Sequence, residues 1–292
     1  MKLKERIKTF VELGSFLNQF SREEAPKNNH ILNSQFYEDF TNMLSNVTVE
    51  NPWFTQKHVQ ASIKGICEFL KEEKILNWIE KYPVSSQNTG LHVAVIMAGN
   101  IPMVGFHDML CVLLSGHHFI GKLSSKDNQL LEFMAKLLIK LNPEFEQLIQ
   151  FQSERLSGEK KFDAIIATGS NNSARYFEAY FKKYPNIIRR NRNSIAILNG
   201  NESEKELKAL GNDIFLYFGL GCRNVSKLYI PEGYDLKKLL DTWTDYSYVI
   251  DHSKYANNYD YQRSILLMNQ EPHLDNGYVL LQIGRASCRE RV

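Results

Sequence analysis

The sequence has few cysteines, almost no net charge and no long apolar run. Three of its four cysteines, Cys67, Cys111 and Cys222, are widely spaced and form no CxxC pair. This spacing indicates neither a disulfide framework nor a zinc site, and it fits a reducing, cytoplasmic setting. No stretch approaches the roughly 20 apolar residues that a membrane-spanning helix needs, so no membrane span is predicted.

The last ten residues, 283–292, read as the translation of sequencing-adapter DNA. We therefore expect a non-native tail, and a natural protein that continues beyond Gln282. The tail holds three arginines, one glutamate and the fourth cysteine, so the remaining chain has equal numbers of basic and acidic residues. This balance, without a basic stripe, argues against nucleic-acid binding.

A truncated second domain would expose sheet edges, so we expect this 292-residue chain to aggregate or to lack activity.

The apolar pattern predicts a helical N-terminal region followed by alternating strands and helices. Apolar residues recur at helical spacing up to about Tyr82, and short apolar runs begin at His92. Such alternation is typical of parallel β-α-β units, so the predicted class is α/β with a domain boundary near residue 190. The expected strands are 92–97, 118–123, 162–167, 194–198, 225–231 and 278–282; the expected helices are 103–115, 128–141, 172–184 and 204–218.

Two residues at predicted turns could carry chemistry. Cys222 lies beside glycines in Phe218–Asn224, where a flexible backbone could expose its thiol as a nucleophile. A small buried residue near a turn is the alternative. Asn100 follows the strand 92–97, and its side-chain amide could donate to an oxyanion. An Asx turn leading into the next helix is the alternative there.

Two further segments could bind a charged ligand. The amides that open the predicted helix 172–184 could bind an anion, although a plain helix cap explains the same residues equally well. The end of the predicted strand 118–123 and the residues that follow it carry ammonium and hydroxyl groups. These groups could hold a ribose or its phosphate, or the segment could be an ordinary surface loop. The eight histidines lack metal-ligand spacing, and no glycine-rich nucleotide fingerprint is present. The residues of the helix start are Thr168, Gly169 and Ser170. The residues of the strand end are Lys122, Ser124, Ser125 and Lys126.

Taken in order, these pieces resemble the aldehyde dehydrogenase superfamily. More specifically, the chain resembles its acyl-CoA reductase branch, which includes the fatty-acid reductase of bacterial bioluminescence. The motifs are Val93–Pro102, Gly121–Ser125, Ala167–Ser170 and Gly219–Cys222, and the likeness spans about residues 91–282. The resemblance implies an aldehyde dehydrogenase-like fold. Residues 1–190 would hold the N-terminal helices and a Rossmann-like NADP-binding domain, and residues 191–282 a truncated catalytic domain.

The resemblance also implies a role for each candidate residue. Cys222 matches the acyl-accepting nucleophile, and Asn100 matches the oxyanion-hole amide, which the backbone N–H of Cys222 completes. The cofactor contacts are implied at two places. Lys122, with Ser124 and Ser125, would contact the adenosine ribose, and Thr168, Gly169 and Ser170 would lie against the pyrophosphate and nicotinamide side.

Two departures from the superfamily pattern refine the expected chemistry. Ile197 stands where the oxidative enzymes place the glutamate that activates water, so the acyl-enzyme is expected to be reduced and not hydrolysed. Ser125, followed by Lys126, stands where NAD enzymes often carry a ribose-binding carboxylate. A carboxylate would repel a 2′-phosphate, so these residues favour NADPH over NADH.

The expected function is therefore NADPH-dependent reduction of a fatty acyl thioester, acyl-CoA or acyl-protein, to the aldehyde through a Cys222 acyl-enzyme. The alternatives are an acyl-phosphate reductase of the same superfamily and a non-catalytic acyl-binding protein of this fold. The expected partners are the thioester substrate, an acyl-transferring or acyl-activating protein, and further copies of the chain in a homo-oligomer.

Overall fold

The computed structural model describes residues 1–23, 26–84, 90–152 and 162–284. They fall into two compact units, Met1–Asn191 and Arg192–Val292, called unit 1 and unit 2 below. Residues 285–292 of the expected non-native tail lie outside the described residues. Among the described helices, none combines the length and apolar character that crossing a bilayer requires.

Unit 1 begins with helices, as predicted. They are α1 (Leu3–Leu17) with a 3-10 turn at Asn18–Phe20, α2 (Asn33–Glu50), α3 (Gln56–Phe69) and α4 (Glu72–Ile79). The side chains of Phe10, Leu13 and Phe16 are fully buried, because residues at this spacing share one face of α1. That face joins a core that also contains the ring of Phe106.

A five-stranded parallel sheet follows, with strand order β3-β2-β1-β4-β5. Its strands are β1 (His92–Ile96), β2 (His118–Lys122), β3 (Ile149–Gln152), β4 (Ala164–Thr168) and β5 (Asn186–Arg189). The predicted α/β class is confirmed, and three predicted strands correspond to β1, β2 and β4. The two outer strands, β3 and β5, were not predicted. Each has only four residues and none of them is fully buried, so neither produces an apolar run.

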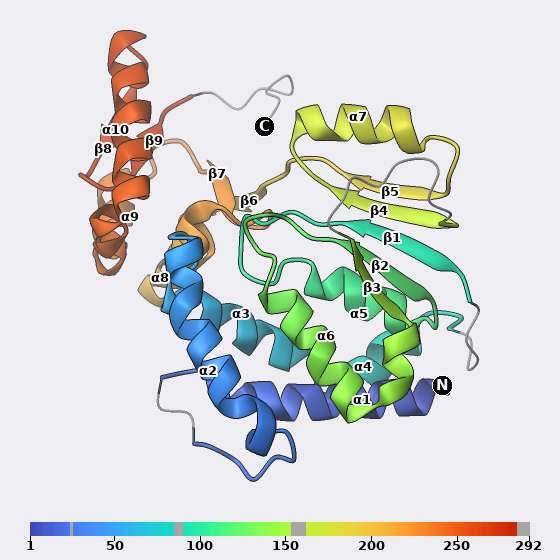
Figure 1. Cartoon of the computed structure of the whole chain (residues 1–292). Coiled ribbons are helices and arrows are strands. Elements are labelled where there is room, and N and C mark those ends of the chain that lie inside the picture. Colours follow the sequence, from blue (N-terminus) through green and yellow to red (C-terminus); the bar gives the residue numbers. More distant parts are fainter. Residues whose placement is uncertain (24–25, 85–89, 153–161, 285–292) are drawn as a thin grey trace. The chain divides into compact units, whose positions relative to one another are not determined.

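Helices cover both faces of this sheet (Figure 1). Helices α5 (Phe106–Leu114) and α6 (Leu130–Leu141) lie on one face with the N-terminal helices, and α7 (Asn171–Phe181) lies on the other. Val93 and Val95 join the large core, whereas Ala94 joins a smaller core on the α7 side. Because β1 is buried on both faces, it reads as a continuous apolar run instead of an alternating one. A 3-10 turn, Pro143–Gln147, precedes β3.

Unit 2 contains two small sheets and several helices. Its strands are β6 (Ser194–Ile197) and β7 (Val225–Tyr229), which pair in parallel, and β8 (His273–Asp275) and β9 (Leu280–Gln282), which pair antiparallel. Its helices are α8 (Glu204–Phe215), α9 (Leu236–Thr242) and α10 (Ser253–Met268), with 3-10 turns at Leu216–Gly219 and Thr244–Asp251.

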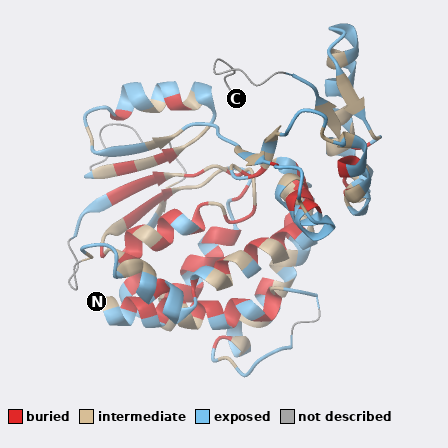
Figure 2. Ribbon diagram, turned by 180° about the vertical axis from the view of Figure 1, so that it is seen from behind, coloured by how far each residue is buried: buried red, intermediate tan, exposed pale blue. Residues whose placement is uncertain are grey.

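Buried residues are concentrated in the helices and inner strands of unit 1, whereas α10 of unit 2 buries no residue (Figure 2). The core of unit 2 is centred on Trp243, whose indole N–H donates to the Leu207 carbonyl at 2.9 Å. The predicted helix 204–218 was too long. Helix α8 ends at Phe215, because Tyr217 and Phe218 adopt left-handed backbone conformations that no right-handed helix can include.

Candidate functional site

The candidate residues of unit 1 gather at one edge of the parallel sheet. Asn100 follows β1, Lys122 ends β2 and Thr168 ends β4, and these three strands are neighbours in the order β2-β1-β4. The carboxyl ends of parallel strands share one edge, which is where open α/β sheets bind ligands. The sheet topology therefore brings together three segments that are far apart in the sequence (Figure 1).

The loop that carries Asn100 packs tightly against the loop that follows β2. A Cβ atom at Gly99 would lie 2.7 Å from the Cβ of Ser124, so only glycine allows this approach. The Met97 N–H also donates to the Lys122 carbonyl at 3.1 Å, which extends the pairing of β1 and β2. Asn100 and Ser124 therefore belong to one packed layer at the sheet edge.

The loop after β2 closes in a tight turn. The Asp127 N–H donates to the Ser124 carbonyl at 3.1 Å, and the Lys126 N–H donates to the Ser124 hydroxyl at 3.3 Å. Asn51 secures this turn by donating from Nδ2 to the Lys126 carbonyl at 3.1 Å. Ser125 and Lys126 are exposed, and within the described part of the chain Lys126 forms no ion pair. A cation is thus presented to solvent at the sheet edge.

The segment Thr168–Ser170 starts helix α7. Ser170 is the N-cap, and its hydroxyl accepts the Ser173 N–H at 3.2 Å. Gly169 donates its N–H to the Arg189 carbonyl at 3.1 Å, and a Cβ there would lie 2.8 Å from the Cβ of Ser173. The geometry shows the capping arrangement, and contact between this turn and an anion stays a prediction.

A buried ion pair at the same edge was not predicted. Arg189, at the end of β5, donates from Nη1 to both carboxylate oxygens of Asp108 in α5, at 2.8 and 2.6 Å. Burial acts to raise the pKa of Asp108, but the neighbouring His107 and the hydrogen bonds from Arg189 outweigh it and hold that pKa below its usual value. The nearby Asp108 carboxylate, followed by the hydrogen bond with Cys111, raises the pKa of His107 to about 9. The partners are 81 residues apart, so no local pattern could reveal them.

Cys222 lies in unit 2, in a short turn between the Leu216–Gly219 segment and β7, and its side chain is half-buried. Asn224 fixes this turn from both sides. Its Oδ1 accepts the Gly221 N–H at 2.7 Å, and its Nδ2 donates to three carbonyls at the end of α8, at 2.8 to 3.3 Å. Sequence analysis assigned no role to Asn224, although asparagine is a common turn residue because its side chain bonds nearby backbone groups.

The backbone before Cys222 is strained. Tyr217 and Phe218 each have a φ of 56°, and Gly219 has a φ of 74°. Left-handed conformations of residues other than glycine cost on the order of 1–3 kcal/mol each and cluster at functional sites. Within the described part of the chain, the Cys222 N–H donates no hydrogen bond. The turn therefore offers a thiol and an unused amide donor at the same residue.

Position 197 carries isoleucine in place of the glutamate that the oxidative enzymes have there. The Ile197 side chain is 77% exposed, and the nearby Glu202 accepts the N–H groups of Asn199 at 2.5 Å and Gly200 at 3.2 Å. These backbone hydrogen bonds, chiefly the one from Asn199, lower the pKa of Glu202. Glu202 is thus a turn-stabilising carboxylate and a poor base.

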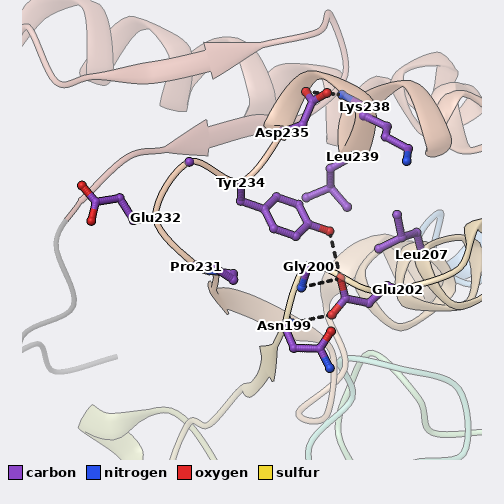
Figure 3. Close-up of a pocket in the computed structure, with 11 residues that line it drawn as sticks. Asn199, Gly200, Glu202, Leu207, Pro231, Glu232, Tyr234, Asp235, Lys238 and Leu239 are labelled. Carbon is purple, nitrogen blue, oxygen red and sulfur yellow. Dashed lines mark hydrogen bonds between the residues drawn. The ribbon is translucent and has the colours of Figure 1, made fainter.

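A pocket of about 280 Å³ lies beside this turn in unit 2 (Figure 3). Two of its polar side chains, Tyr234 and Asp235, already have partners within the chain. Tyr234 donates to Glu202 at 3.3 Å, and Asp235 accepts the Lys238 N–H at 3.0 Å as the cap of α9. Cys222 does not line this pocket, so we do not assign the pocket to the acyl chemistry. Among the described residues, no group of three or more metal-ligating side chains is placed to hold a metal ion.

Comparison with known families identifies the chain. Residues 18–238 match the family described as acyl-CoA reductase (LuxC). The chain belongs to the acyl-CoA reductase (LuxC) family. This match includes the Asn100 loop, the edge of the unit 1 sheet and the Cys222 turn. A search of curated proteins gave no match.

Solved structures show that this acyl-CoA reductase family member has the aldehyde dehydrogenase fold. An NAD-dependent benzaldehyde dehydrogenase from Corynebacterium glutamicum has a TM-score of 0.66 at 13% identity, covering 96% of this chain and 66% of its own. Glyceraldehyde-3-phosphate dehydrogenase GapN from Methanocaldococcus jannaschii, complexed with NADP, scores 0.61 at 12% identity, covering 97% and 71%. Aldehyde dehydrogenase 21 from Physcomitrella patens scores 0.61 at 15% identity, covering 83% and 51%. The chain thus spans only about half to seven tenths of these enzymes.

Proposed function

We propose that this protein reduces a fatty acyl thioester, carried by CoA or by a protein, to the aldehyde with NADPH. The observation that carries the proposal is the Cys222 turn, in a chain that belongs to the acyl-CoA reductase family. A half-buried thiol, a strained backbone and an unused amide donor meet in this turn. Acyl transfer to sulfur needs a nucleophile and an oxyanion donor at one place.

Cys222 would act as the nucleophile. Its sulfur bonds to the acyl carbon, the bond from that carbon to the thiol of the donor breaks, and the Cys222 thiol proton leaves with the departing thiol. The product of this step is a thioester between the acyl group and Cys222. The Cys222 N–H donates to the oxyanion of the tetrahedral intermediate, and the Asn100 side-chain amide is the second donor in this proposal.

The edge of the unit 1 sheet fits a phosphorylated dinucleotide. Lys122 and Ser124 would hold the adenosine ribose, and the exposed Ser125 and Lys126 would accept a 2′-phosphate, since no carboxylate stands at position 125 to repel it. The first turn of α7 offers the positive end of its dipole to the pyrophosphate. When bound, NADPH supplies the hydride that converts the acyl-enzyme to the aldehyde.

Ile197 would preserve the acyl-enzyme for reduction. A hydrocarbon side chain cannot take a proton from water, and the neighbouring Glu202 is held by the backbone N–H groups of its own turn. Hydrolysis of the Cys222 thioester therefore lacks a general base at this position.

The first test follows the acyl group. The full-length protein is incubated with radiolabelled long-chain acyl-CoA, with and without NADPH, and compared with Cys222→Ala and with the control Cys67→Ala. We expect a covalent label that requires Cys222, persists in Cys67→Ala and is released as aldehyde by NADPH. A folded wild-type protein that acquires no label would exclude the thioester mechanism. Turnover of an acyl phosphate without thioester labelling would favour an acyl-phosphate reductase.

A second test addresses the cofactor. Ser125→Glu places a carboxylate beside the proposed site of the 2′-phosphate and should lower the ratio of kcat/KM with NADPH to kcat/KM with NADH by about tenfold or more. The control is Lys136→Glu, a charge change on an exposed residue of α6. An equal change in both variants, or none in Ser125→Glu, would contradict the assignment of this loop.

A further inference from the structure

The loop after β2 contains a buried carboxyl group to which the proposed function assigns no role. Asp127 has 9% of its surface exposed, and its Oδ2 accepts the Met103 N–H at 2.6 Å. Within the described part of the chain, its Oδ1 has no hydrogen-bond partner. Burying a carboxylate without a charged partner is costly, so an uncharged residue would be favoured here if stability alone mattered.

The partner of Asp127 lies in the loop that carries Asn100. Met103 is three residues beyond Asn100 and has a φ of 56°, a conformation that methionine rarely adopts. A short hydrogen bond from a left-handed residue to a charged acceptor can hold such a backbone in place. Gly99, on the other side of Asn100, is pressed against Ser124 of the same turn. The Asp127 turn therefore contacts the Asn100 loop on both sides of Asn100.

We propose that Asp127 is a positioning residue. By accepting the Met103 N–H, it fixes the loop 99–103 and aims the Asn100 side chain at the oxyanion of the acyl-transfer step. This inference rests on the proposed function. The inference adds to the proposed mechanism a residue that touches neither substrate nor cofactor. The Asn51 side chain supports the arrangement from the end of α2, because it bonds the Lys126 carbonyl next to Asp127.

The charge state of Asp127 makes this role measurable. Burial raises the pKa of Asp127 to about 6, although the Met103 N–H acts in the opposite direction. A protonated carboxyl accepts a weaker hydrogen bond than a carboxylate does. His107 has a pKa raised to about 9 and Asp108 a lowered one, so both keep their charge around pH 6. The ends of the adjoining elements that lead to this loop carry the charged groups Lys122, Lys126, Glu50, Glu132, His107 and Asp108.

The test compares Asp127→Asn, Asp127→Leu and the exposed control Asn128→Ala in the full-length protein, with acyl-CoA and NADPH as substrates. Wild-type kcat should fall severalfold as the pH is lowered through about 6. In Asp127→Asn, which keeps a neutral acceptor, this acid limb should be absent and kcat should stay at the low-pH wild-type level. In Asp127→Leu, kcat should fall by up to the roughly 10²–10³-fold that loss of an oxyanion donor causes, with KM little changed.

The decisive comparison is made in an Asn100→Ala background. If Asp127 acts through Asn100, Asp127→Leu should reduce kcat little further there. Additive losses, or an acid limb retained in Asp127→Asn, would overturn the proposal. Should Asp127→Leu fail to fold, the pH profile of Asp127→Asn decides alone. Failure of the proposed function would differ, since turnover would then be unaffected by Asn100→Ala and Cys222→Ala. Asn100-dependent turnover that ignores both Asp127 variants would reject only the positioning role.

Discussion

The ion pair between Arg189 and Asp108 should contribute measurably to the stability of unit 1. Asp108 has 9% of its side chain exposed and Arg189 has 28%, so replacing Arg189 by methionine leaves a buried carboxylate without its main partner. Removing one partner of a buried pair costs about 3–5 kcal/mol. Because Arg189 is partly exposed and His107 Nδ1 lies 3.9 Å from Asp108, we expect a loss near the lower end, about 3 kcal/mol.

The stability lost in Arg189→Met should depend on pH, because the ion pair lowers the pKa of Asp108 in the folded state. In the wild type the pKa of Asp108 is below 3.8, so its contribution is present above pH 3.8 and is lost as the pH falls through the folded-state pKa. Without Arg189, its contributions that lower the pKa of Asp108 are lost while burial still raises it, so that pKa moves upward. Protonation then relieves the penalty, so the deficit of Arg189→Met should be largest at pH 8 and should shrink towards pH 4.5.

Urea unfolding at both pH values measures the deficit, and hydrogen exchange of the α5 peptide 106–114 assigns it to unit 1. The double variant Arg189→Met/Asp108→Leu removes both charges and should recover most of the lost stability. A deficit equal at pH 4.5 and pH 8, or a double variant as unstable as the single one, would refute the electrostatic reasoning.

Three further predictions concern packing and thiol reactivity. Burial, with the charge of Glu68, raises the pKa of Cys67 to about 12, so iodoacetamide at pH 8 should modify Cys222 and leave Cys67 intact in peptide mass spectra; comparable labelling of both would contradict this. Phe10→Ala should lower the free energy of unfolding by about 3–5 kcal/mol, against less than about 0.5 kcal/mol for the 81%-exposed Ile31→Ala. Asn224→Asp replaces the donor that bonds three carbonyls, so it should increase hydrogen exchange of residues 217–224, and unchanged exchange would argue against this anchoring role.

The inner strands of unit 1 were predictable because buried strands produce a recognisable apolar run in the sequence. Strands β1 and β4 are covered on both faces, which requires consecutive apolar residues. The outer strands β3 and β5 lack this signal because they pair along only one edge and are incompletely buried. The end of α8 was also missed, since nothing in Phe215–Phe218 marks a left-handed turn in residues with bulky side chains.

The candidate residues at strand ends were visible from sequence, whereas the groups that hold them were not. Asn100 and Lys122 stand beside recognisable apolar runs. Asp127 and Arg189 are ordinary charged residues of loops and edges in the sequence, and only the order of the strands gives them partners. The partners of a polar side chain depend on tertiary contacts, so local patterns cannot reveal them.

The two proposed oxyanion donors share one physical design. Each lies in a loop with left-handed residues other than glycine: Met103 beside Asn100, and Tyr217 with Phe218 before Cys222. In each loop a buried polar side chain accepts a backbone N–H, Asp127 from Met103 and Asn224 from Gly221. Strain of this kind persists only when the surroundings fix it, and an oxyanion hole needs donors that do not reorganise during the reaction. Relaxing either loop should therefore raise stability and lower turnover together, because the strain and the fixed donor are the same feature of the backbone.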